Sequence, residues 1–412
     1  MVETTNPPYF APVEVEQPDF KTSWKVNIGG SDYDYTDDMT VLKNGNIVAV
    51  GQSYSNDGDF QNLLKGGSIA YINQYDPKGE LLKTLTLGGT EYDSIAYAAK
   101  VCGLDDGGFV VSGGYQEGVY VAPTGDFAQL DTAGTVHGQM DTFIAKYDSN
   151  SKLIWMSNFS GSANDQVKQI KATDDGGIAV LIETNSNDGD MENQNRGLYD
   201  LVIVKYDAHG KKVWQRVLGG KNIETSSSGL DILSDGSFIV AGSLSSKSGD
   251  FADVDWYGDI FDCFAAKISA TGELLWTKAY GGDRNDYCNS VLATSDGGFI
   301  LMGNTKSTTD TFAPIGTGYD NAYVLKCNET GETEWVNVIK SSEASEMISA
   351  IELENQYVFI GQSRGTDYDV TGLNKGSMDV FIANYEKNGT LKTIENIGGS
   401  KADYASEIMV LN

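Results

Sequence analysis

The chain contains the stretch Asp262-Cys-Phe-Ala-Ala-Lys-Ile-Ser-Ala-Thr-Gly-Glu-Leu-Leu-Trp276, followed by Tyr280-Gly281-Gly282, Ser295-Asp296-Gly297-Gly298 and the apolar run Phe299-Ile300-Leu301-Met302. One apolar segment ends at a Gly turn, a second opens on Trp, and after the double Gly two more are joined at Asp-Gly-Gly. Apolar runs of about five residues, bounded by Gly and Asp and without helical spacing, are typical of short antiparallel strands. The stretch therefore predicts four consecutive strands.

Versions of this stretch recur along the chain at intervals of about 60 residues. The position that opens the strand after the Gly turn holds Trp24, Lys83, Trp155, Trp214, Trp276, Trp335 and Thr393. A double Gly follows as Gly29-Gly30, Gly88-Gly89, Gly219-Gly220, Gly281-Gly282 and Gly398-Gly399, while one unit has Gly161 alone and another has Ser341-Ser342. We interpret the repeated Trp residues as packing between sheets. Four-stranded units repeated without helices predict an all-β fold, the β-propeller.

The four strands of a unit are named A to D, starting after the double Gly. The A–B and C–D links are tight turns, such as Asp105-Asp106-Gly107-Gly108, whereas the B–C and D–A links are longer. Alternate links of an antiparallel meander lie at opposite ends of the strands. The long links therefore share one face of the propeller, called here the long-loop face, and this face is the expected binding surface.

The number of repeats predicts how the ring closes. Strands of types A and D each occur seven times, but types B and C occur six times, because a D strand at 24–30 precedes the first unit and an A strand at 405–411 follows the last. We therefore predict a seven-bladed β-propeller over residues 24–412 as a single domain, with the two termini sharing one blade. The alternative is six blades. Residues 1–23 form a Pro-rich segment in which residues 9–16 could add a strand.

Composition limits the classes of partner. The chain of 412 residues has 58 acidic and 29 basic residues and a formal net charge of −29, which argues against binding to nucleic acid or to anionic membrane surfaces. No apolar run reaches the roughly 20 residues of a transmembrane helix, and the first residues do not resemble a signal peptide. The four Cys residues lack metal-binding spacing; Cys263 and Cys288 open strands of adjacent units and could approach each other.

Acidic clusters in the B–C loops are candidate cation sites. Asp57 and Asp59 lie in Ser55-Asn-Asp-Gly-Asp59, and Asp188 and Asp190 lie in the identical sequence of a later unit. Short loops of Asp, Asn and Gly can supply the converging oxygens that Ca²⁺ requires, although the full spacing of a calcium loop is not met. The alternative is that these residues only stabilise turns, which Asn, Asp and Gly do well.

Two B–C loops stand out because they are rich in aromatic residues. Residues 114–141 contain Tyr115, Tyr120, Phe127 and His137, and residues 248–262 contain Trp256 and Tyr257. Exposed aromatic rings beside carboxylates suit stacking on a carbohydrate or a peptide. We therefore predict that these six residues contact the ligand. The alternative is that they pack as a lid over neighbouring loops.

The repeat resembles a known family. The pattern Asp200-Leu-Val-Ile-Val-Lys-Tyr-Asp207, then Gly210, Trp214 and Gly219-Gly220, then Ser234-Asp-Gly-Ser-Phe-Ile-Val-Ala-Gly242 and Gly249-Asp250-Phe251, is similar to the bacterial β-propeller repeat of secreted and cell-surface proteins. The resemblance covers nearly the whole chain from Trp24 onward. It implies an extracellular or cell-surface location in a bacterium and a role in binding or display, and it implies no particular ligand.

We therefore expect a binding or adhesion module that recognises a glycan, peptide or protein partner and forms part of a larger surface protein. The alternative is an enzyme, either a glycan-active hydrolase or a quinone-dependent dehydrogenase, because the Gly-x-x-x-Trp turn looks like the tryptophan repeat of those dehydrogenases. Catalysis has little support in the sequence. The two His residues, His137 and His209, belong to opposite faces of the predicted propeller, which argues against a Ser-His-Asp arrangement.

Overall fold

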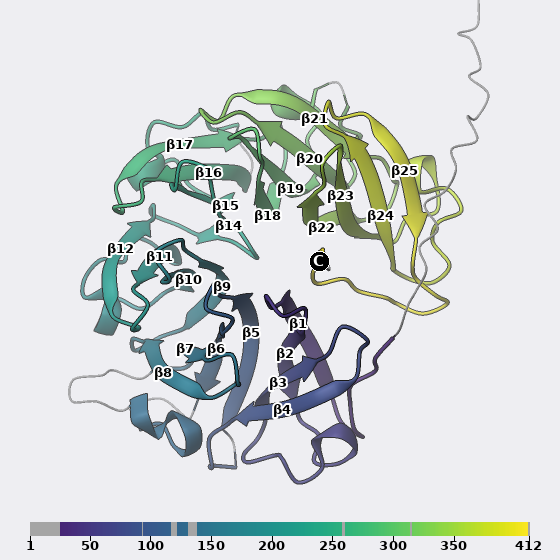
Figure 1. Ribbon diagram of the computed structural model, residues 1–412. Helices are drawn as coiled ribbons and strands as arrows, with labels where there is room; N and C mark the ends of the chain where they lie inside the picture. The colour runs from purple at the N-terminus through teal and green to yellow at the C-terminus, as the bar shows by residue number, and fades with distance from the viewer. Residues whose placement is uncertain are drawn as a thin grey trace, which may run out of the picture.

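The structure is a computed structural model, and it describes residues 25–92, 94–116, 122–130, 138–257, 260–313 and 315–410. In these residues the strands form six antiparallel sheets arranged as a ring around a central axis (Figure 1). Strand A of each sheet lies nearest the axis and strand D lies at the rim. The prediction of an all-β propeller is confirmed.

Each sheet is a meander of consecutive strands. The first sheet contains β1 (Asp34–Val41), β2 (Ile47–Ser53), β3 (Ile69–Tyr75) and β4 (Leu81–Leu87). The second contains β5 (Ile95–Gly103), β6 (Phe109–Gln116), β7 (Asp141–Tyr147) and β8 (Leu153–Phe159). The third contains β9 (Asp165–Ala172), β10 (Ile178–Thr184), β11 (Asp200–Tyr206) and β12 (Lys212–Leu218).

The inner strand of the fourth sheet is divided into β13 (Glu224–Thr225) and β14 (Leu230–Ile232), which both pair with β15 (Phe238–Leu244). The fourth sheet continues with β16 (Asp262–Ile268) and β17 (Leu274–Tyr280). The fifth contains β18 (Asp286–Ala293), β19 (Phe299–Thr305), β20 (Asn321–Cys327) and β21 (Thr333–Ile339). The sixth contains β22 (Ser345–Glu352), β23 (Gln356–Ser363), β24 (Asp379–Glu386) and β25 (Leu391–Asn396).

The position of a strand in its sheet explains its composition. The two middle strands, such as β15 and β16, are buried along their whole length, which is why they are almost continuously apolar. The rim strands are half-exposed, and the inner strands alternate between buried and partly exposed residues. Adjacent sheets bury their faces against each other, so that the core is a series of layers between blades. Cys263 and Cys288 are free thiols side by side in one of these layers.

The Trp residues on the rim strands of the second to fifth sheets each contact the following sheet. The ring of Trp155, on the rim strand β8, lies against the turn between β11 and β12 in the third sheet, where its Nε1 donates to the carbonyl oxygen of Ala208 at 3.1 Å. Trp214 repeats this contact with the carbonyl oxygen of Ala270 at 3.2 Å. The turn residue under each ring is a Gly, namely Gly210, Gly272, Gly331 and Gly389. The interpretation of the Trp register as packing between sheets is confirmed for these residues.

The two ends of the described chain lie at a seventh position of the ring, between the sixth and first sheets (Figure 1). Residues 397–410 take the place of an A strand beside β22, since the amide of Asp403 donates to the carbonyl oxygen of Met378 and Ser349 Oγ donates to Glu407. Residues 25–33 take the place of a D strand beside the first sheet, against which Ile28 packs. Neither segment contains a strand in the described residues, and the predicted added strand at residues 9–16 lies outside them.

Substitution of two Gly residues by Ala distinguishes the effect of backbone strain on stability from the effect of packing between sheets. Gly210 and Gly236 both have φ = +78°, but a Cβ on Gly210 would lie 2.6 Å from Trp155 Cδ2, whereas a Cβ on Gly236 would meet nothing within 4 Å. Gly236→Ala should lower the free energy of unfolding by about 1–2 kcal/mol, the cost of a left-handed backbone. Gly210→Ala should lower it by about 1–3 kcal/mol more, because the added methyl overpacks the junction. Equal losses in urea unfolding would contradict the proposed junction contact.

Candidate functional site

A short 3₁₀ turn follows strand B in every sheet. At the long-loop face it forms hydrogen bonds with the chain from the preceding position of the ring. These turns are η1 (Gly58–Phe60), η2 (Gly125–Leu130), η3 (Gly189–Met191), η4 (Gly249–Phe251), η5 (Asp310–Phe312) and η6 (Tyr368–Val370). The second residue of each turn exchanges two hydrogen bonds with the chain that enters from the preceding position of the ring. For example, Asp190 Oδ2 accepts the amide of Ser160 at 3.0 Å, and the amide of Asp190 donates to the carbonyl oxygen of Ser160 at 2.9 Å.

The four carboxylates predicted as calcium ligands belong to two of these turns. Asp59 Oδ2 accepts the amide of Gly29 at 2.9 Å, and Asp190 does the same for Ser160. Asp57 Oδ1 accepts the amide of Ser31 and Asp188 Oδ1 that of Ser162, both at 2.7 Å. The alternative role as turn stabilisers is therefore present in the structure. Among the described residues no group of three or more His, Cys, Asp or Glu could hold a metal ion, and calcium binding stays a prediction.

The aromatic residues of the first long loop divide into two groups. Tyr115 is 3% exposed and Phe127 is 0% exposed, and their rings stack on each other with centroids 4.8 Å apart. Both belong to the core, so neither offers a ring face to a ligand, which corrects the prediction for these two residues. Phe127 is the third residue of a Gly-Asp-Phe turn, and the equivalent Phe60 and Phe251 are also buried. Tyr120 and His137 lie outside the described residues.

The second aromatic loop lies beside a groove at the rim. Trp256 is half-buried against the core of the fourth sheet, whereas Tyr257 lines the groove, together with Asp253 and Asp255. The groove has a volume of about 370 Å³ and continues along β17 to the β20–β21 turn of the fifth sheet. Lys278 and Glu332, which both line the groove, form an ion pair with each other. The structure thus brings Tyr257 together with carboxylates, a cation and hydroxyl groups.

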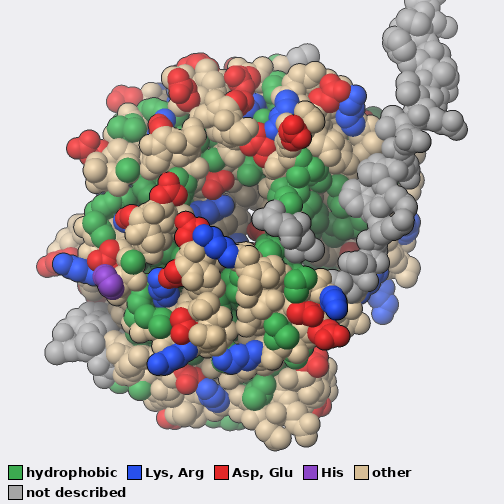
Figure 2. All heavy atoms as spheres, in the orientation of Figure 1, with side chains coloured by type: hydrophobic (Ala, Val, Ile, Leu, Met, Phe, Trp, Pro, Cys, Tyr) green, Lys and Arg blue, Asp and Glu red, His purple; other side chains and the backbone are tan. Residues whose placement is uncertain are grey.

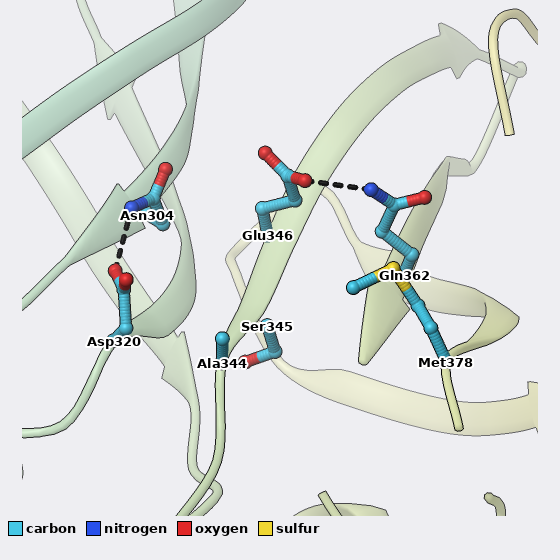
Figure 3. A pocket seen from close by; sticks show the side chains of 7 residues that line it. All are labelled: Asn304, Asp320, Ala344, Ser345, Glu346, Gln362 and Met378. Carbon is cyan, nitrogen blue, oxygen red and sulfur yellow. Dashed lines mark hydrogen bonds between the residues drawn. The ribbon is translucent and has the colours of Figure 1, made fainter. Parts of the chain in front are cut away.

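A second cavity lies at the junction between the fifth and sixth sheets, at the long-loop ends of their strands. Figure 3 shows Asn304 and Asp320 on one side, Glu346 between, and Gln362 and Met378 on the other. Ala344 and Ser345 complete a lining that encloses about 110 Å³. Sequence reasoning missed these residues. The available signal was the substitution of Ser341-Ser342 for the double Gly just before this junction.

Charged groups also gather on the inner strands around the axis. Asp38 is buried, and its Oδ2 accepts the amide of Val101 at 2.9 Å, while Lys171 Nζ lies 3.1 Å from Asp231 Oδ1. Lys100 Nζ reaches Ser228 Oγ in the fourth sheet at 2.8 Å. On the face shown in Figure 2, acidic side chains are spread among basic ones. His209 lies in the turn between β11 and β12, on the side of the tight turns, as the sequence predicts.

Several buried carboxyl groups near the junctions hold protons near neutral pH. Burial raises the pKa of Asp165 to about 8, of Asp286 to about 7 and of Glu224 to about 7. Thr184 Oγ1 and Ser186 Oγ donate to Asp165, which opposes but does not cancel the effect of burial on its pKa. Because these pKa values exceed those of the unfolded chain, the folded state binds more protons than the unfolded state in this pH range.

Stability should therefore fall as pH rises through these folded-state pKa values. We expect a melting temperature several degrees higher at pH 5 than at pH 8.5, measured by circular dichroism at constant ionic strength. Asp165→Asn should narrow this difference, because it removes one titrating group. Asp207→Asn is the matched control, since the amide of Lys211 lowers the pKa of Asp207 and places its titration below the range. A difference that Asp165→Asn leaves unchanged would contradict this assignment.

Comparison with known proteins gives no family assignment. No protein-family model matches the chain. The chain is 24% identical over 315 residues to the regulatory protein FlaEY of Caulobacter vibrioides, an alignment that covers 66% of this chain and 32% of that protein. The chain thus spans about a third of the length of this curated relative. No helix in the described residues has the length and apolar character to cross a membrane.

The similar solved structures include two bacterial proteins of unknown function. One, from Bacteroides caccae, has a TM-score of 0.42 and 11% identity, covering 79% of this chain and 89% of that chain. The other, from Dyadobacter fermentans, has a TM-score of 0.44 and 11% identity, covering 82% and 93%. A mutant of the Synechocystis apocarotenoid oxygenase has a TM-score of 0.41 and 8% identity, covering 90% and 82%. These similarities say nothing about activity.

Proposed function

We propose that this chain is a binding module that recognises a glycan, peptide or protein partner through its long-loop face. The observation that carries the proposal is the groove that begins at residues 253–257 of a long loop and extends over the rim, where Tyr257 offers a half-buried ring next to the exposed carboxylates of Asp253 and Asp255. A ring held in place by its neighbours supplies contact area at a small entropic cost, and the adjacent carboxylates supply directional hydrogen bonds. Such a surface suits the hydroxyl groups of a glycan or the amides of a peptide.

The location outside the cell, at a bacterial surface and within a larger protein, is part of the same proposal. Its support is the resemblance of the repeat to that of secreted and cell-surface propellers. The net charge of −29 supports a hydrated surface that repels nucleic acid and anionic lipid. An acidic surface also favours partners that carry basic or uncharged hydrogen-bond donors.

The proposal is tested by probing glycan and peptide arrays with the labelled chain and then measuring the affinity of the strongest hit. Tyr257→Ser should weaken that affinity at least about tenfold, because anchoring Tyr residues commonly contribute 2 kcal/mol or more to an interface. Tyr92→Ser is the matched control, since Tyr92 is 95% exposed in a D–A loop and does not line the groove. Unchanged binding by the Tyr257 variant, or turnover of the bound glycan, would contradict the proposal.

A further inference from the structure

The junction between the fifth and sixth sheets differs from the repeat at two consecutive residues, which are the first two of the inner strand β22. The inner strands β1, β9 and β18 begin with Asp34, Asp165 and Asp286, but β22 begins with Ser345. The second residue of each of these inner strands pairs with the penultimate residue of strand B. In the three sheets that begin with Asp, this second residue is Tyr35, Gln166 or Tyr287. In the sixth sheet it is Glu346, paired with Gln362. A carboxylate thus moves from the buried capping position to the wall of the cavity in Figure 3.

The amide donors around this cavity are already used. Gln362 Nε2 donates to Glu346 Oε1 at 2.6 Å, and Asn304 Nδ2 donates to Asp320 Oδ1 at 2.6 Å (Figure 3). Asn289 Nδ2 donates to the second oxygen of Glu346 at 2.9 Å. The hydroxyl oxygen of Ser345 accepts a hydrogen bond from the backbone amide of Ala322. The polar groups left for a ligand are therefore mainly acceptors.

Gln362 presents a buried acceptor to the cavity. Its side chain lines the cavity and the residue is 8% exposed, yet its Oε1 has no hydrogen-bond partner among the described residues. Reversing the carboxamide would turn this oxygen toward the carboxylate of Glu346, where two acceptors would repel each other. A buried acceptor without a donor is unfavourable, because it has lost its hydrogen bonds to water. A ligand that brings hydrogen-bond donors would remove this penalty.

The charge of the cavity favours a cationic donor. Glu346 forms no ion pair with any Lys or Arg of the described residues, and Asp320 has Lys306 Nζ at 3.4 Å, from a side chain that is itself 42% exposed. The site is small, because 110 Å³ corresponds to about three or four water molecules. Met378 and Ala344 add apolar contacts to the wall. These properties suit an ammonium group and the first carbons of its alkyl chain.

We propose that this cavity binds a primary alkylammonium group, either a lysine side chain of a partner or a free alkylamine. The inference rests on the proposed function, because it names a chemical group that the long-loop face would recognise. An ammonium group has three donors and no acceptor. In a cavity lined mainly by acceptors, each of its N–H groups can therefore face an acceptor rather than another donor. The alkyl chain would leave through the mouth of the cavity toward the long-loop face.

The test is isothermal titration calorimetry of the chain with n-butylammonium chloride and, separately, with Nα-acetyl-lysine methylamide. Both probes should bind, and the Nε-acetylated lysine should not, because acetylation removes the charge and two of the three donors. Glu346→Gln should weaken binding of both probes at least tenfold, since it removes the uncompensated charge while keeping the shape. Glu343→Gln is the matched control, because Glu343 is an exposed residue of the same loop that does not line the cavity.

The outcomes separate this inference from the proposed function. Binding of both probes supports the ammonium site for either source, and binding of one alone assigns the source. Equal binding by the Glu346 and Glu343 variants, binding of the acetylated probe, or no heat with either amine would overturn the inference. A calcium chloride titration whose heat is lost in Glu346→Gln, with no heat from the amines, would overturn it in favour of a metal site. A hit on the arrays that depends on Tyr257 would leave the proposed function intact in each of these cases.

Discussion

The structure depends on one constraint, which is that each sheet can bury its faces only against its two neighbours. A four-stranded sheet has no core of its own, and so the junction between adjacent sheets is the stable unit of the ring. The repeated residues serve that junction. The Trp of a rim strand lies over the Gly of the next C–D turn, and the 3₁₀ turn of the next sheet binds the chain as it leaves that rim strand. The repeat in the sequence is thus a repeat of contacts between sheets rather than within them.

The same constraint explains why so acidic a chain places carboxyl groups inside its junctions. The backbone that crosses from strand D to strand A exposes amide donors that need acceptors, and the first residue of strand A supplies one. Asp34 accepts the amide of Gly30 at 2.7 Å, and Asp286 accepts that of Gly282 at 3.0 Å. Where this position is fully buried, desolvation exceeds the stabilisation by these hydrogen bonds, and the pKa of Asp286 rises. The ring therefore accepts protons near neutral pH as a consequence of how its sheets are joined.

The sequence contained nearly all of the fold because the fold is made of short local signals that repeat. The turn glycines, the apolar middle strands and the Trp register each predicted their structural role correctly. The closure of the ring was less accessible, because residues 25–33 and 397–410 take the places of strands without forming them in the described chain. A strand is stabilised by pairing with a neighbouring strand, and the sequence of a single strand does not contain its partner.

The candidate site was harder to predict because residue type alone does not distinguish packing from contact. Phe127 and Tyr257 both lie in long loops near acidic residues, but Phe127 occupies the buried third position of a Gly-Asp-Phe turn and Tyr257 does not. Comparison among the repeats of this one chain would have separated them. A residue type that recurs at the same position of every unit packs between sheets. A residue that differs from the repeat at its position does not have to make that contact.

Glu346 illustrates the consequence of such a difference. At the junctions capped by Asp165 and Asp286 the carboxylate accepts hydrogen bonds from two hydroxyl groups, and burial raises its pKa. At the sixth sheet Ser345 takes the capping position, and the carboxylate one residue later faces a cavity instead of a hydroxyl cluster. Moving an acid by one residue along a strand transfers it to the opposite side of the strand, because side chains alternate. The same strand geometry that confines the other acids to the junction core thereby places Glu346 where a molecule from solution can reach it.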